Sequence, residues 1–162
     1  MKTTLVIYLL ASIALAVSMV LADEKPWFDV KNCDFCKQFD KEPGLLENLE
    51  NEYHNISNGV VSFHHIDKKF EAALARAQAG VGKVIQDMQS GKIPTTCVHC
   101  GMLGEFTRAG VRQEGVETKF GTIMIMTSPD SAMVAKLQDF GRKTAEATAK
   151  FKAERAAAKS GK

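Results

Sequence analysis

Two long segments carry apolar side chains at steps of three or four residues, the spacing of a helix with one apolar face. The first stripe consists of Phe70, Leu74, Ala77, Val81, Ile85 and Met88, and the second of Met133, Leu137, Phe140, Thr144, Thr148 and Phe151. We expect Asp130 or Ser131 to cap the second helix. The stripe ends at Phe151, so the Ala- and Lys-rich residues 153–162 are predicted to form a basic, solvent-exposed tail.

Two shorter segments alternate instead and predict β-hairpins. They are "NGVVSFHHID" at residues 58–67 and "FGTIMIMTSPD" at residues 120–130. In the first, we expect Asn58-Gly59 to form the centre of a two-residue turn, because such turns favour residues that tolerate positive φ.

The two halves of the chain present similar features in the same order. "CDFC" at 33–36 corresponds to "CVHC" at 97–100, and the matching segments lie 62 to 64 residues apart. Each half then predicts a CxxC short helix, a β-hairpin and a long helix, over residues of about 27–90 and 91–152. We predict an α+β fold of two similar fused units. Their hairpins form one four-stranded antiparallel sheet with the helices on one face, in a single domain over 23–152.

The N-terminus has the pattern of a secretory signal peptide. Lys2 precedes a long apolar run, and small residues end at Ala22, which predicts cleavage after residue 22. A retained membrane anchor is the alternative, but Asp23 and Glu24 follow at once and no basic cluster does. We therefore expect a periplasmic or secreted protein with no stable membrane insertion after signal cleavage.

Charge and composition exclude several classes. Removal of the signal leaves 20 basic residues (21 − 1) against 19 acidic ones, which is no footprint for nucleic acid. Four cysteines are too few for a small disulfide-rich fold. No arrangement of nucleophile, base and oxyanion donor is evident, so an enzymatic role is uncertain and disfavoured.

The candidate chemistry lies in the two CxxC pairs, Cys33 with Cys36 and Cys97 with Cys100. Each pair is expected to open a helix, whose N-terminal dipole stabilises thiolates for metal ligation or for redox chemistry. If the pairs meet in space, four thiolates form the tetrahedral set that structural zinc uses. Two separate metal sites, a dithiol redox site and two structural disulfides remain open alternatives.

Further candidate ligands accompany the thiols. His99 lies inside the second CxxC and Met102 follows it closely. Strand alternation places His64, Met124 and Met126 on one sheet face, and we expect the opposite face, with Val61 and Phe63, to pack on the core. A histidine and two methionines would suit Cu(I) as a second metal face. Ordinary apolar packing of the methionines is the simpler alternative.

Two resemblances bear on function. "WFDVKNCDFCKQF" and "KIPTT" are similar to segments near a thioredoxin dithiol, which implies thiol–disulfide exchange as an alternative function. "CVHCGM", followed by a hydrophobic residue, a hairpin, "TKFG" and a helix opened by "SPDSAM", resembles the NosL-like family of extracytoplasmic copper chaperones. That resemblance implies a two-unit α+β fold, Cu(I) binding with Cys97, Cys100 and Met102 as candidate ligands, and delivery to a partner protein.

We therefore expect a soft-metal-binding protein that stores or carries copper(I), with zinc as a possible alternative metal. Cys97 and Cys100 are the expected main ligands, completed by His99 or Met102. Cys33 and Cys36 either form an equivalent site or join the same one. The expected partners are the metal ion and a metal-accepting protein, and the sequence leaves the oligomeric state open.

Overall fold

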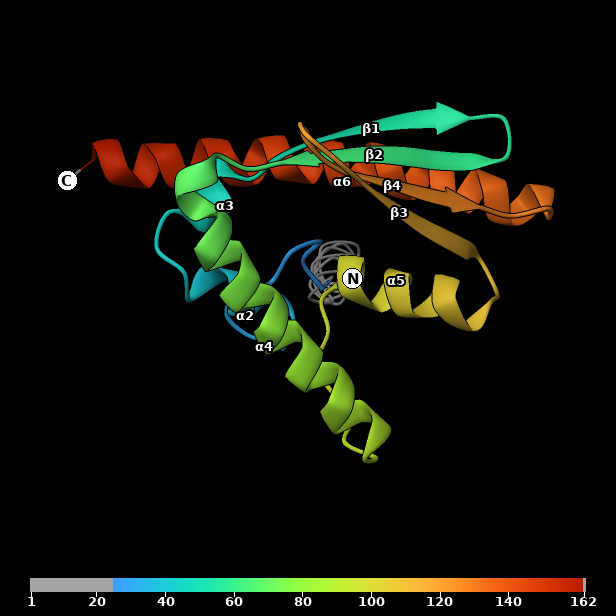
Figure 1. Cartoon of the computed structure of the whole chain (residues 1–162), viewed down its shortest axis with the longest axis horizontal. Helices are drawn as coiled ribbons and strands as arrows, with labels where there is room; N and C mark the ends of the chain where they lie inside the picture. The colour runs from blue at the N-terminus through green and yellow to red at the C-terminus, as the bar shows by residue number, and fades with distance from the viewer. Residues whose placement is uncertain (1–24, 162) are drawn as a thin grey trace, which may run out of the picture.

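A computed structural model describes residues 25–161, so the expected signal peptide at 1–22 lies outside the described residues. Helical segments precede and follow each of two hairpins, and each half of the chain contributes one hairpin (Figure 1). The elements are α2 (Cys36–Asp40), α3 (Leu45–Asn48), β1 (Glu50–Ile56), β2 (Gly59–His65), η1 (Lys68–Phe70), α4 (Glu71–Gln89), α5 (Val98–Arg108), β3 (Arg112–Thr118), β4 (Gly121–Thr127) and α6 (Ser131–Ser160).

The four strands form one antiparallel sheet in the order β1-β2-β4-β3, which confirms the α+β class and the joining of two hairpins. Strands β2 and β4 pair at the centre, and each hairpin contributes one outer strand. Both hairpins have seven-residue strands. The duplication that would explain this likeness stays a prediction.

The first hairpin turn differs from the prediction by one residue. Ile56 pairs with Gly59, so the turn consists of Ser57 and Asn58 rather than of Asn58 and Gly59. Gly59 does not adopt positive φ. A side chain is excluded there for another reason, because a Cβ on Gly59 would lie 1.9 Å from the Met126 carbonyl oxygen. The glycine is needed for close approach of β4, not for the turn.

Gly121 has the equivalent place in the second hairpin, 62 residues later (121 − 59 = 62). A Cβ on Gly121 would lie 2.2 Å from the carbonyl oxygen of His64, and its φ of +131° is unfavourable for other residues. The two central strands therefore approach each other closely at both ends of their contact.

The sheet packs on the core with the face opposite to the one predicted. Val60, Ser62 and Met126 are buried, whereas Phe63 on the other face is 44% exposed. The pattern could not select the face, because β4 presents isoleucines on one side and methionines on the other. Gly141 of α6 fits the observed face, since a Cβ there would lie 2.8 Å from Val60 Cγ2.

The main core lies between this face and helices α5 and α6. It consists of Val60, Phe106, Val111, Met126, Leu137 and Phe140. Asp130 caps α6, accepting a hydrogen bond from the Met133 amide at 2.7 Å, as one of the two predicted caps. The predicted α6 stripe is confirmed at its centre, where Leu137, Phe140 and Thr144 are at most 1% exposed.

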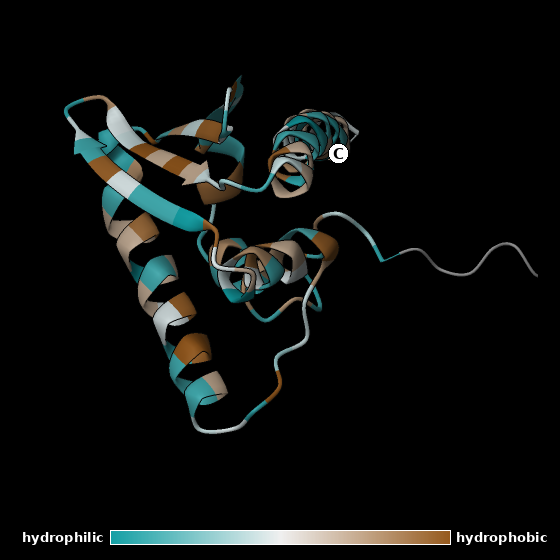
Figure 2. Ribbon diagram, turned by 90° about the vertical axis from the view of Figure 1, so that its right-hand side faces the viewer, coloured by the Kyte–Doolittle hydropathy of each residue, from teal (hydrophilic) through white to brown (hydrophobic). Residues whose placement is uncertain are grey.

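Only one of the two long helices covers the sheet. Helix α6 lies across β1, β2 and β4, whereas α4 packs on α2 and projects away from the sheet (Figures 1 and 2). A second, smaller core consists of Leu45, Ala73 and Ala77. The distal part of the predicted α4 stripe is uncovered, with Ile85 45% and Met88 42% exposed. Both long helices were predicted to lie on one face of the sheet, but only α6 does so.

Helix α6 continues to Ser160, through most of the segment expected as a solvent-exposed tail. Arg155 pairs with Asp40 at 2.7 Å and with Glu47 at 3.2 Å. The ring of Phe151 contacts that of Phe28 at 6.4 Å between centroids. These contacts fix the end of α6 to the segments around the first CxxC.

Candidate metal centre

Two segments far apart in the sequence bring the CxxC pairs together. Cys36 is the first residue of α2, and Cys97 is the N-cap of α5. The segments are joined by backbone hydrogen bonds. The Asp34 amide donates to the Thr95 carbonyl at 2.9 Å, and the His99 amide donates to the Trp27 carbonyl at 3.1 Å. The second pair opens α5, as predicted, whereas in the first pair only Cys36 belongs to α2 and Cys33 precedes the helix.

The two helices that carry the cysteines begin without side-chain caps. The N-cap of α2 is Phe35 and that of α5 is Cys97, and neither makes a side-chain capping bond. Asn32 instead bonds to Asp29, whose carboxylate accepts the backbone amide and the side-chain amide of Asn32, each at 2.9 Å. The turn that precedes Cys33 is thus stabilised by Asp29, a residue that lies before α2 in the chain.

The four thiols form one cluster. The sulfurs of Cys33, Cys36, Cys97 and Cys100 all lie within 4.8 Å of one another. The Cys36 sulfur lies 3.6 Å from that of Cys97 and 3.6 Å from that of Cys100, so the close contacts join one pair to the other. Cys33 and Cys97 are buried, and the other two are partly buried. Of the alternatives open from the sequence, a single shared site is the one that this geometry provides.

The cluster favours one thiolate over the others. Hydrogen bonds from the thiols of Cys100 and Cys36, helped by the backbone amides of Cys100 and Asp29, lower the pKa of the Cys97 thiol against the effect of burial. The pKa of Cys36 is raised, because its thiol bonds to Cys100 and Cys97 and is partly buried. A metal ion would displace the remaining protons.

The donor set fits a thiophilic metal ion. In a tetrahedral zinc–thiolate site each bond is about 2.3 Å, which gives sulfur–sulfur edges of about 3.8 Å. The 3.6 Å contacts of Cys36 are close to this edge. The wider pairs, at up to 4.8 Å, need only small side-chain rotations to reach it.

His99 lies beside the cluster among aromatic rings. Its Nδ1 is 3.9 Å from the Cys100 sulfur. Its ring stacks on Phe140 at 5.0 Å between centroids and contacts Phe28 at 5.1 Å. Burial lowers the pKa of His99 to about 4, so the ring is neutral at physiological pH. A neutral nitrogen is available next to the thiols, outside the four-sulfur set.

The methionines pack in or against the main core, and the sheet histidine, His64, is partly buried on the same face of the sheet. Met102 and Met124 pack against the core cluster and Met126 is 3% exposed within it. His64 Nε2 lies 2.8 Å from the Ser62 hydroxyl oxygen. The suggested second metal face is thus the face covered by α6, and its methionines have the packing role weighed in the sequence analysis. Among residues 25–161, the four cysteines are the one group of three or more histidines, cysteines or acids close enough to share an ion.

Asp34 is a positioning residue that the sequence analysis missed. Its carboxylate accepts the Thr95 amide at 2.8 Å and pairs with Lys37, and these bonds lower its pKa. It therefore connects the loop of the first CxxC to the segment preceding the second. The position of this acidic residue inside a CxxC could have suggested such a role, but its partner, Thr95, lies 61 residues away in the sequence.

Comparison with models of known protein families, with curated proteins and with solved structures found no match. The resemblance to copper chaperones therefore stays a prediction based on the residues that carry it. No helix within the described part of the chain is long and apolar enough to cross a membrane.

Proposed function

We propose that the protein binds one soft metal ion through Cys33, Cys36, Cys97 and Cys100 and holds it for storage or transfer outside the cytoplasm, with copper(I) as the metal. The gathering of four thiols within 4.8 Å is the observation that carries the proposal. Thiolate sulfur is a preferred ligand of Cu(I). The partial exposure of Cys36 and Cys100 supports transfer, because an incoming ligand needs access to at least one sulfur.

Zinc is the second candidate, in a structural role. Four thiolates with short contacts near the tetrahedral edge form a closed zinc set. Such a site would join the α2 segment to the N-terminus of α5 and would stabilise the fold directly.

The test is a competition titration of the reduced protein against chromophoric chelators for Cu(I) and for Zn²⁺. We expect one ion per chain for the metal that is retained. Copper retained while zinc is released supports the carrier, and the reverse supports the structural site. If the chelators remove both metals from the protein, the proposal is refuted and thiol–disulfide exchange becomes the function to test.

Two variants locate the site. We expect Cys36→Ser to weaken binding by at least about tenfold, since one of four ligands is lost. Met102→Leu is the matched control, because Met102 packs against the core and leucine preserves its volume. Equal retention by both variants would show that the metal lies elsewhere.

A further inference from the structure

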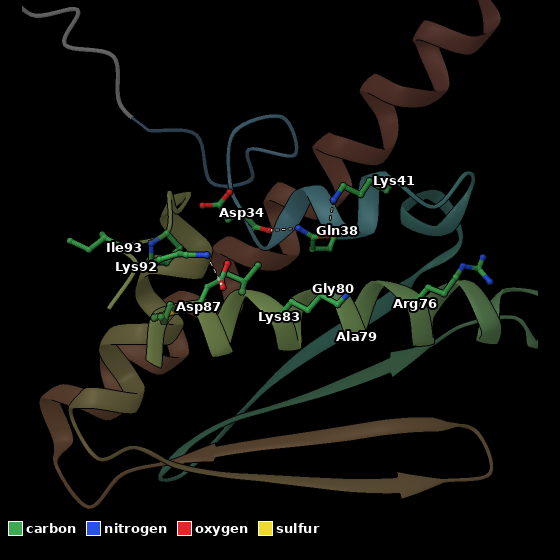
Figure 3. Close-up of a pocket in the computed structure, with 13 residues that line it drawn as sticks. Asp34, Gln38, Lys41, Arg76, Ala79, Gly80, Lys83, Asp87, Lys92 and Ile93 are labelled. Carbon is green, nitrogen blue, oxygen red and sulfur yellow. Dashed lines mark hydrogen bonds and ion pairs between the residues drawn. The ribbon is translucent and has the colours of Figure 1, made fainter. Parts of the chain in front are cut away.

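A groove lies beside the cysteine cluster, between α2, α4 and residues 92–94, with a volume of about 700 Å³ (Figure 3). We call it the α2–α4 groove. Asp34 and Pro94 line it, and Asp34 also bonds to Thr95 across the joint between the two cysteine segments. One side of the groove is therefore continuous in the chain with both CxxC pairs.

The α2–α4 groove carries an excess of positive charge. Four cations and two acids line it: Lys41, Arg76, Lys83, Lys92, Asp34 and Asp87. Both acids are paired, since Asp34 binds Lys37 and Asp87 binds Lys92 at 2.9 Å. Glu42 likewise pairs with Arg76, at 2.6 Å.

Two ammonium groups of the groove remain without a carboxylate among the described residues. Lys41, the C-cap residue of α2, donates to the Gln38 side chain at 2.9 Å, and Lys83 on α4 has no ion pair in residues 25–161. They come from the two helices that form the walls of the groove (Figure 3). An occupant with carboxylates can therefore be held from both sides.

Exposed apolar side chains accompany these charges. Val84 and Met88 of α4 line the groove, and Ile93 is 95% exposed beside them. Val84 and Met88 come after Ala73 and Ala77, the α4 residues of the smaller core, and Ile93 follows the end of α4. A cluster of large, solvent-exposed apolar side chains is typical of a protein-binding surface. The flexible side chain of methionine can adapt to different partners.

We propose that the α2–α4 groove binds an acidic, amphipathic segment of the protein that receives the metal. This inference rests on the proposed function. Carboxylates of the segment would pair with Lys41 and Lys83, and its apolar face would cover Met88 and Ile93. Docking at this position brings the acceptor next to the partly exposed Cys36 without occupying the thiols.

The probe is a fluorescein-labelled synthetic peptide with glutamates and leucines at helical spacing, and the control peptide has lysines in place of the glutamates. Binding to the full-length reduced protein is measured by fluorescence anisotropy, with and without zinc or Cu(I). We expect the glutamate peptide to bind, to weaken with added salt, and to bind more tightly than the lysine peptide by at least about tenfold.

Two protein variants test the place of binding. Lys41→Glu combined with Lys83→Glu should weaken the glutamate peptide by at least about tenfold, whereas Lys136→Glu, an exposed lysine on α6, should not. Ile93→Asp should also weaken it, and this change should leave the fold intact because the Ile93 side chain is 95% exposed. Metal titration of the same variants is expected to be unchanged.

Three outcomes overturn the inference: no binding of the glutamate peptide, equal binding to the Lys41/Lys83 variant and wild type, or displacement by citrate at the same concentration as by the peptide. The last would assign the groove to small anions. Failure of the proposed function is a separate result. The metal titration would then show no metal binding, whereas the peptide assay would still show whether the groove binds an acidic segment.

Discussion

The buried ring of His99 gives the metal-free protein a stability that depends on pH. Burial lowers its pKa from 6.5 to about 4 in the folded chain. Between these two pH values, His99 binds a proton in the unfolded chain but not in the folded chain. The contribution of His99 to the free energy of unfolding is therefore fully present above pH 6.5 and is lost as the pH falls toward 4. At about 1.4 kcal/mol per pKa unit, the loss is about 3 kcal/mol.

The assay is urea unfolding of the reduced, metal-free protein above pH 6.5 and near pH 4, for wild type and for His99→Leu. The low pKa of the Cys97 thiol gives a slope of the same sign in both proteins, so their difference isolates the histidine. We expect the free energy of unfolding of the variant to fall by about 3 kcal/mol less than that of wild type.

His54→Gln is the control, because it removes a histidine whose side chain is exposed on the sheet. It should keep the wild-type dependence on pH. If His99→Leu loses as much stability as wild type on acidification, the reasoning is refuted. Histidine NMR titration of the wild-type protein provides a direct check, since the His99 ring should stay neutral down to about pH 4.

Three further predictions concern packing, backbone and metal. Phe140→Ala should lower the free energy of unfolding by about 3–5 kcal/mol and Phe63→Ala by less than about 1, because their exposures are 1% and 44%; equal losses in urea would contradict the orientation of the sheet. Gly121→Ala should cost about 1–3 kcal/mol or more, since its Cβ meets a backbone carbonyl at 2.2 Å, while Gly82→Ala, with nothing within 4 Å, should stabilise α4 by about 0.5–1 kcal/mol; thermal unfolding that ranks them in the opposite order would exclude this account. Metal at about one hundred times its dissociation constant should stabilise the reduced protein by about 2.7 kcal/mol, with a gain that shrinks on acidification because the thiols must lose protons; a melting temperature insensitive to metal would count against the four-thiolate site.

The local elements of the fold could be predicted, since their periodicities are set by neighbours in the chain. Alternation located the two central strands, β2 and β4, and the stripe of α6 identified Leu137 and Phe140 as core residues. The choice of sheet face could not be predicted in the same way. β4 has apolar residues on both sides, and the packing of Gly141 on Val60, which favours one side, is a contact between distant segments.

The same distinction applies to the candidate site. The cysteines were recognisable as ligands from their spacing, and their shared site was one of several possibilities. The two cysteine segments are joined by contacts such as the bond between Asp34 and Thr95, which no local pattern reveals. The burial of Met102 and Met126 has a similar origin, because a methionine in an amphipathic segment fits a core and a copper site equally well until its neighbours are known.

The separation of the two cysteine pairs along the chain has a consequence for how the protein folds. Cys36 lies 61 residues from Cys97 and 64 from Cys100, so a metal ion that joins them closes a long loop of chain. A covalent cross-link over such a loop would remove unfolded-chain entropy worth about 4 kcal/mol. During folding, either CxxC can capture an ion at once, whereas the second pair arrives only after the intervening hairpin and α4 have brought the segments together. An ion that binds early in folding would therefore be coordinated by only two sulfurs, and would be accessible to competing ligands, until the long loop closes.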